Sequence, residues 1–119
     1  MPKTVLFVCL HGAGKSRMAA ALFNAIAPED WQATSAGTEP QAIISVHPAR
    51  LLAGTEAENF VDQALPRSIQ AVAVEPAQIV AIDCTLSGAE HWQLEHSQFD
   101  EQMRDEIQGR VMALVNKLA

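Results

Sequence analysis

A cysteine, two glycines, a lysine and a serine lie close together near the start of the chain. They belong to the run Cys9-Leu10-His11-Gly12-Ala13-Gly14-Lys15-Ser16, which stands between an apolar segment and a segment with helical periodicity. Backbone N–H groups at the start of a helix are free to bind an anion, and the helix dipole adds positive potential. A cysteine thiolate is a nucleophile, and cations and helix N-termini favour it. The run therefore predicts an anion-binding loop with a nucleophile at its first position.

One interpretation is a loop for a tetrahedral oxyanion that Cys9 attacks. Backbone N–H groups would surround the oxyanion and hold its central atom in line with the thiolate. Gly12 and Gly14 permit the dihedral angles that such a loop requires. Lys15 would supply positive charge, because a lysine in the first turn of a helix is opposed by the dipole unless an anion is present. The predicted oxyanion-binding residues are Leu10, His11, Gly12, Ala13, Gly14, Lys15 and Ser16.

A second interpretation of the same run is a nucleotide-binding P-loop. That motif has a glycine, four further residues and then Gly-Lys-Ser or Gly-Lys-Thr. Gly14-Lys15-Ser16 fits the end of the motif, but Cys9 stands where the first glycine belongs. The apolar run that ends at Asp83 is also compatible, because a strand ending in aspartate can hold magnesium in such proteins. These residues alone leave both interpretations open.

The elements that must position the loop indicate an α/β fold. Short continuous apolar runs over 4–9, 31–36 and 78–83 are typical of strands buried on both faces of a parallel sheet. Ligands of such sheets bind at the carboxyl ends of the strands, where Cys9 would lie. We expect a three-layer α/β/α domain with a central parallel sheet of about four strands.

Helices are expected between and after these strands. Apolar residues at helical spacing predict one helix over 16–27 and another over 98–118, with Ser97 as the N-cap of the second. The other expectations are a helix that begins at Val46-His47-Pro48 and resumes over 56–65, an ambiguous strand or loop over 68–74, and a polar loop over 87–97.

Length and composition are those of a single folded domain over residues 1–119. The net charge of −6 argues against general binding to nucleic acid or anionic membranes, which requires a basic surface. The chain has no apolar stretch of membrane-spanning length and no leader-like N-terminus, so we expect a cytoplasmic protein. The two cysteines and four histidines lack metal-site spacing, and neither a metal nor a cofactor is expected.

Several blocks of the sequence resemble the low-molecular-weight protein tyrosine phosphatases, and most closely their thiol-dependent arsenate reductase branch. In that family a strand leads to Cys-x5-Arg-Ser and then to a helix, as the segment from Cys9 to Leu22 does with lysine for arginine. The resemblance implies a cysteine-dependent phosphatase or arsenate reductase that binds phosphate, arsenate or a phosphorylated substrate. Residues 49–76 match poorly, and the further matching blocks are Ser35-Ala36-Gly37-Thr38-Glu39-Pro40, Val46-His47-Pro48, Glu90-His91-Trp92 and Arg104-Asp105-Glu106-Ile107.

The resemblance also implies a role for each matching residue. Cys9 would be the nucleophile, Ser16 would hydrogen-bond its thiolate, and Lys15 would bind the oxyanion. Cys84 falls near the family's second cysteine and would resolve an oxidised Cys9, with an external thiol reductant completing the turnover. His96 falls at or beside the position of the family's general acid and would donate a proton to the leaving group.

Departures from the family pattern bear on activity. The family's loop arginine, a bidentate oxyanion clamp, is Lys15 here, which has the charge without the planar fork. Gly12 replaces the family's loop asparagine. The Asp-Pro pair that supplies the family's general acid is missing after Trp92, which is the aromatic residue expected to form a wall of the site. An alternative is therefore a catalytically impaired module of the same fold that binds phosphate or another protein.

Overall fold

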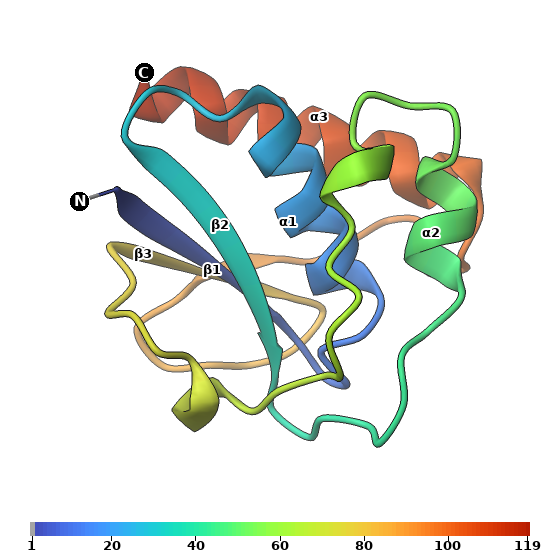
Figure 1. The fold of residues 1–119 in the computed structure, drawn as a ribbon, viewed down its shortest axis with the longest axis horizontal. Coiled ribbons are helices and arrows are strands. Elements are labelled where there is room, and N and C mark those ends of the chain that lie inside the picture. Colours follow the sequence, from blue (N-terminus) through green and yellow to red (C-terminus); the bar gives the residue numbers. More distant parts are fainter. Residues whose placement is uncertain (1) are drawn as a thin grey trace.

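The structure, a computed structural model, describes residues 2–119 and is built on one parallel sheet (Figure 1). Its strands stand in the order β2-β1-β3-β4. Their bounds are Lys3–Cys9 for β1, Trp31–Gly37 for β2, Gln78–Ile82 for β3 and Glu90–Trp92 for β4. Strand β1 pairs with both β2 and β3, and Val5 to Val8 are almost completely buried, as in a central strand of a parallel sheet. The predicted central sheet of four strands is confirmed.

The main helices cover one face of this sheet. Helices α1 (Lys15–Ile26) and α3 (Glu101–Leu118) pack against each other there, and the short helix α2 (His47–Leu52) contacts both (Figure 1). Phe7 of β1 and Phe23 of α1 belong to the core between the sheet and these helices, with their rings edge to face. No helix within residues 2–119 combines the length and the apolar character needed to cross a membrane.

The opposite face of the sheet has a much thinner cover. Leu6 and Val8 point to this side, where they pack with Ala36 against partly buried residues of the 3-10 turn η2 (Ile69–Ala71) and nearby loops. Figure 1 shows this turn on the side of the sheet away from α1 and α3. Helical segments therefore flank both faces, but only the first face has long helices.

The predicted continuation of a helix over 56–65 is wrong. Only the 3-10 turn η1 (Glu58–Phe60) forms there, and the chain then runs on without regular structure. The guanidinium of Arg17 donates hydrogen bonds to the backbone carbonyls of Asp62 and Ala64. These bonds hold the segment after η1 against α1, and Val61 leaves η1 with the extended dihedral angles φ −67° and ψ 120°, which end the helical turn.

The last helix begins at Glu101 rather than at position 98, and its N-cap is Asp100 rather than Ser97. The Asp100 carboxylate accepts a hydrogen bond from the Met103 N–H at 3.0 Å. This is the ordinary capping geometry, in which a side chain binds a free N–H of the first turn.

Strand β4 lies within the stretch 87–97 that was expected to be a polar loop. It pairs with the last residues of β3, with Val80 opposite Glu90 and Ile82 opposite Trp92. The two strands are parallel, and residues 83–89 connect them without a helix. The ambiguous stretch 68–74 contains η2 and meets β2 in a single bridge.

Candidate active site

Cys9 is the last residue of β1 and is 5% exposed, at the floor of a pocket. Its Sγ lies 3.1 Å from Oγ of Ser16, which is in the first turn of α1. The same hydroxyl lies 3.4 Å from the Ala36 carbonyl oxygen, a longer contact. When the thiol ionises, the Ser16 hydroxyl can donate to the sulfur, and a hydrogen bond to an anion stabilises it. The structure thus brings the predicted nucleophile and its predicted partner together.

The start of α1 faces this sulfur with free backbone donors. Gly14 is the N-cap and provides no side-chain acceptor, and the first turn contains no acidic residue. The first backbone N–H groups of a helix have no partner within it, so they remain available for an anion. Residues 2–119 hold no group of three or more His, Cys, Asp or Glu side chains placed to bind a metal.

Glycines allow two close contacts of the loop. Gly12 has a φ of 64°, and a Cβ there would lie 2.6 Å from the backbone nitrogen of Gly37 at the end of β2. A Cβ on Gly14 would lie 2.6 Å from the ring of Phe99. The loop is therefore packed tightly between the end of β2 and an aromatic ring, which fixes its backbone.

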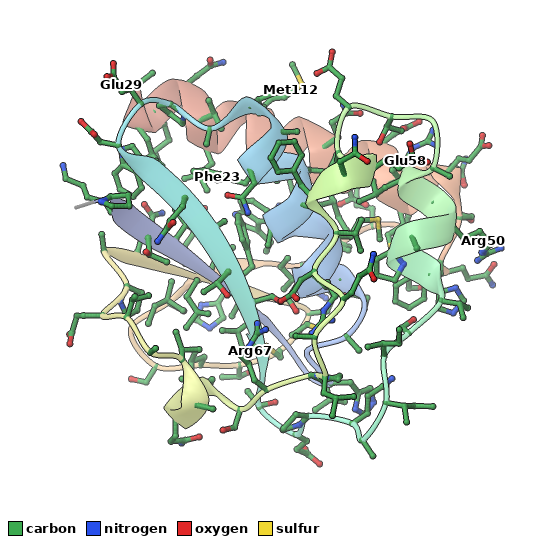
Figure 2. All side chains as sticks on the ribbon, viewed as in Figure 1. Phe23, Glu29, Arg50, Glu58, Arg67 and Met112 are labelled. Atoms are coloured by element: carbon green, nitrogen blue, oxygen red, sulfur yellow. The ribbon has the colours of Figure 1, made fainter. Side chains whose placement is uncertain are left out.

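The pocket above Cys9 has a volume of about 460 Å³. The ring of Phe99 stacks on His47, with centroids 4.3 Å apart and planes 7° apart, and Arg50 hydrogen-bonds the His47 ring at 2.9 Å. Figure 2 labels Arg50 on α2 at the edge of the molecule. The residues that line the pocket outside the loop are Gln41, Ser45, His47, Ile82, Asp83 and Phe99.

Trp92 does not form the expected aromatic wall. It is 5% exposed, and its ring packs 5.7 Å from that of Phe7 in the core. Its indole N–H donates to the Glu90 carboxylate at 2.6 Å. The stacked rings of His47 and Phe99 form the aromatic wall instead. Nothing in the sequence around either residue indicated that the two would pair.

Lys15 is held by an ion pair at the rim of the pocket. Its Nζ lies 2.7 Å from Oδ2 of Asp83, and the two side chains are 21% and 19% exposed. Asp83 follows β3 with a φ of 53°, and its other carboxylate oxygen accepts the Leu94 N–H at 2.8 Å. The predicted oxyanion-binding cation thus has a carboxylate partner in this structure.

Arg17 is a second cation near the loop, and it is 2% exposed. Burial lowers the pKa of its guanidinium, whereas the charges of Asp62 and of a Cys9 thiolate raise it. Asp62 is also paired with Arg67 at 2.7 Å, beside β2 (Figure 2). Nε and Nη2 of Arg17 make no hydrogen bond among the described residues. An arginine stays charged in proteins, so Arg17 favours an anion at Cys9.

His96 is not among the residues that line the pocket. Its Nδ1 lies 3.0 Å from Oε1 of Glu106 on α3. The same carboxylate accepts the backbone N–H groups of Glu95 and His96 and pairs with Arg110. Proton donation by His96 stays a prediction that this arrangement does not support. His11 does line the pocket, and its Nδ1 lies 3.3 Å from the Glu39 carbonyl oxygen.

Glu106→Gln is expected to destabilise the fold by about 1–2 kcal/mol at neutral pH, since hydrogen bonds to a charged group are lost. Burial raises the pKa of Glu106, but bonds from Glu95, His96 and Arg110 outweigh it and lower that pKa to about 2. The folded-state pKa is thus below the ordinary 4.5, so the contribution is complete above pH 4.5 and disappears toward pH 2. Urea unfolding of both proteins between pH 7 and pH 2.5 measures this. If the two proteins differed in unfolding free energy by the same amount at pH 7 and at pH 2.5, the stabilising role of the Glu106 carboxylate would be contradicted.

Cys84, the candidate resolving thiol, lies beside the end of β1 but not in the pocket. Its Sγ is 3.6 Å from the Val8 carbonyl oxygen, and it packs on the thinly covered face of the sheet. Burial raises the pKa of this thiol, and a charge on Cys9 raises it further. Cys84 and Cys9 are both free, and resolution of Cys9 by Cys84 stays a prediction.

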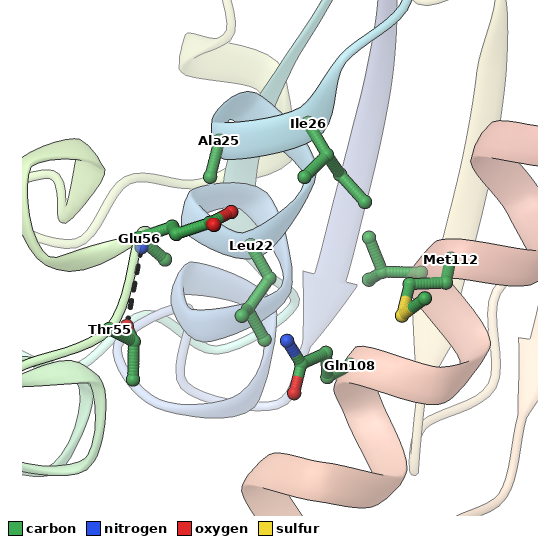
Figure 3. Close-up of a pocket in the computed structure, with 9 residues that line it drawn as sticks. Leu22, Ala25, Ile26, Thr55, Glu56, Gln108 and Met112 are labelled. Carbon is green, nitrogen blue, oxygen red and sulfur yellow. Dashed lines mark hydrogen bonds between the residues drawn. The ribbon is translucent and has the colours of Figure 1, made fainter.

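A smaller pocket of about 190 Å³ lies toward the other end of α1 (Figure 3). Leu22 and Ile26 of α1 face Gln108 and Met112 of α3 across it, and the segment that contains Glu56 closes one side. It has no nucleophile or cation among its lining residues. This smaller pocket therefore lacks the thiol and the cation that line the pocket above Cys9.

Comparison with known proteins agrees with this geometry. Residues 4–108 match the family model described as low molecular weight phosphotyrosine protein phosphatase. An arsenate reductase from Archaeoglobus fulgidus is 30% identical, with a TM-score of 0.66 over 96% of this chain and 97% of that one. A thioredoxin-dependent arsenate reductase from Corynebacterium glutamicum is 26% identical, with a TM-score of 0.72. That match covers 98% of this chain but only 62% of the Corynebacterium chain.

A low molecular weight protein tyrosine phosphatase from T. tengcongensis has the same fold, with 20% identity and a TM-score of 0.69. That match covers 97% of this chain and 99% of the other. The family model covers most of the chain and includes Cys9, Ser16 and the strands that position them. The chain therefore belongs to the low molecular weight phosphotyrosine protein phosphatase family.

Proposed function

We propose that this chain is a cysteine-dependent oxyanion enzyme that hydrolyses small phosphate monoesters, with Cys9 as the nucleophile. The observation that carries the proposal is the Cys9 sulfur, 3.1 Å from the Ser16 hydroxyl at the floor of the pocket. The thiolate would form an S–P bond while the P–O bond to the leaving group breaks. Water would then cleave the S–P bond and release inorganic phosphate. The backbone from Leu10 to Ser16, with Lys15, would bind the phosphoryl oxygens.

The shape of the pocket supports an organic phosphate as substrate. Its volume of about 460 Å³ extends beyond the loop to Ile82 and to the stacked rings of His47 and Phe99. A phosphoryl group bound by the loop would therefore leave space against this wall for a leaving group with a flat or apolar part. Aromatic rings contribute such contact area at low entropic cost.

The enzyme is expected to hydrolyse only esters with good leaving groups at a substantial rate. Asp83 is the only carboxylate among the described lining residues, and it is paired with Lys15. A general acid contributes roughly 10²–10⁴-fold when a leaving group needs a proton. We expect kcat/KM for p-nitrophenyl phosphate to exceed that for an alkyl phosphate by at least about a hundredfold. Comparable values for the two esters would show that another residue supplies the proton.

Arsenate reduction is a second candidate, favoured by identity to arsenate reductases and by the free thiol of Cys84 near the end of β1. Cys9 would attack arsenate and displace water to form an S–As bond. A second thiol would then attack the Cys9 sulfur, so that two sulfurs lose two electrons, arsenic gains them, and arsenite leaves. An external dithiol would reduce the disulfide. Arsenite formation that requires added thiol would support this candidate, whereas aryl phosphate hydrolysis requires no reductant.

A non-catalytic phosphate- or protein-binding module is a third candidate, since Lys15, the cation at the rim of the pocket, is already paired with Asp83. Phosphate binding without hydrolysis or arsenate reduction under any condition would support it. The P-loop alternative has no support from the family to which the chain belongs. Magnesium-dependent nucleotide binding would contradict all of the oxyanion proposals.

A further inference from the structure

The cation that replaces the family's loop arginine is already paired in this structure. Nζ of Lys15 contacts Oδ2 of Asp83 at 2.7 Å, at the rim of the pocket above Cys9. Both side chains are about four-fifths shielded from solvent. An oxyanion that enters the loop must therefore share Lys15 with a carboxylate or displace that carboxylate from it.

Asp83 is well fixed for this role. Its other carboxylate oxygen accepts the Leu94 N–H at 2.8 Å, and its residue follows the buried end of β3 at Ile82. Its left-handed φ of 53° further restricts the backbone. Lys15, in contrast, has a long flexible stem, so the lysine rather than the aspartate is the partner that can move.

We propose that Asp83 is an affinity-determining residue of the oxyanion site, because it competes with the bound oxyanion for Lys15. The inference rests on the proposed oxyanion site but not on turnover. The carboxylate opposes binding because it holds Lys15 in the free protein, so the incoming oxyanion must break that ion pair or share the lysine with it. Among the described residues that line the pocket, no other acidic side chain has this position.

Asp83→Asn tests the proposal with little change in structure. Asparagine tolerates a left-handed φ and keeps an oxygen that can accept the Leu94 N–H, but it removes the charge. The readout is the concentration of inorganic phosphate that halves iodoacetamide labelling of Cys9, measured on the Cys9 peptide by mass spectrometry. We expect this concentration to fall about fivefold, since a partly exposed ion pair changes an equilibrium constant by up to about that factor.

Glu39→Gln is the matched control. Glu39 is exposed, its backbone N–H bonds the Leu10 carbonyl of the loop, and its change raises the net charge by the same one unit. Phosphate protection in this variant is expected to stay within about twofold of the wild-type value, since exposed charges are strongly screened. An equal gain in Glu39→Gln and Asp83→Asn would overturn the proposal, because net charge alone would then explain the result.

The change of Asp83 is then repeated in a Lys15→Gln background. If the carboxylate acts through Lys15, its removal has a smaller effect there than in the wild type. An equal or larger effect would overturn competition for Lys15. Unchanged or weaker phosphate protection in the single Asp83→Asn variant would also overturn it and would identify Asp83 as a residue that orients Lys15 for binding. Absence of protection by phosphate in every variant, the wild type included, would instead contradict the proposed oxyanion site itself.

Discussion

Cys9→Ser is expected to reduce hydrolysis of p-nitrophenyl phosphate by at least about a thousandfold, because the nucleophile is lost and the loop alone supplies only part of the rate. The Cys9 sulfur lies at the floor of the pocket, next to the hydroxyl that would stabilise its anion. Among the described residues, the side-chain hydrogen-bond partner at this position is the Ser16 hydroxyl, which is a poor base. Steady-state kinetics with matched protein concentrations measure the loss.

Cys84→Ser is the matched control, because it makes the same atomic change at a thiol outside the pocket. Phosphatase activity is expected to stay within about threefold of the wild type, the range of a surface or partly buried change. Arsenite formation, if the protein has that activity, should fall in this variant only where Cys84 is the resolving thiol. Hydrolysis by Cys9→Ser above about one percent of the wild-type rate would contradict covalent catalysis at Cys9.

Gly12→Ala is expected to destabilise the protein by about 2–4 kcal/mol and to abolish phosphate binding. Gly12 has a left-handed φ of 64°, and its new Cβ would lie 2.6 Å from the Gly37 nitrogen and 2.9 Å from the Ala36 carbonyl carbon. These atoms are backbone, so neither a rotamer change nor a small side-chain shift relieves the contact. Urea denaturation gives the free energy of unfolding, and phosphate protection of Cys9 gives the binding.

Gly54→Ala separates backbone strain from steric contact as the cause of the destabilisation. Gly54 has a φ of 78°, but a Cβ there would meet no atom within 4 Å. Its cost is expected to be about 1–2 kcal/mol, which is the strain of a left-handed residue alone. A Gly12→Ala variant as stable as Gly54→Ala, with phosphate binding intact, would show that the loop does not depend on its close contact with β2.

The anion-binding loop was predictable because all of its determinants are local. Eight consecutive positions contain Cys9, Gly12, Gly14 and Ser16, and few other loops combine these residue types. An apolar run before them and helical periodicity after them place the loop at the carboxyl end of a strand. The structure has this arrangement, with β1 ending at Cys9 and α1 beginning at Lys15.

The rest of the pocket comes from segments far away in the sequence, and no local pattern indicates it. Phe99 precedes α3 and stacks on His47, at the start of α2, so its role depends on how two helices meet. Asp83 had the signature of a strand end or a magnesium ligand, and only the three-dimensional contact identifies it as the partner of Lys15. The general-acid role of His96 stays a prediction from its position in the sequence, and the structure places its Nδ1 3.0 Å from Oε1 of Glu106.

The burial of Arg17 is a further feature that the sequence patterns did not predict. A charged residue in a helix is normally solvent-exposed, and burial of its guanidinium depends on acceptors elsewhere in the chain. Those acceptors are the backbone carbonyls of Asp62 and Ala64, in the irregular segment after η1. The burial of Arg17 therefore depends on acceptors more than forty positions away, which no local pattern indicates.

The central claim is that Cys9 forms a covalent bond to the oxyanion, and rapid quenching with denaturant at neutral pH during turnover of p-nitrophenyl phosphate tests it most directly. Mass spectrometry of the digested, quenched protein is expected to find one phosphoryl group on the peptide that contains Cys9. The adduct should be absent in Cys9→Ser and in protein quenched without substrate. A phosphoryl group on a different residue, such as His11 or His47 of the pocket lining, with none on Cys9 while hydrolysis proceeds, would contradict the claim.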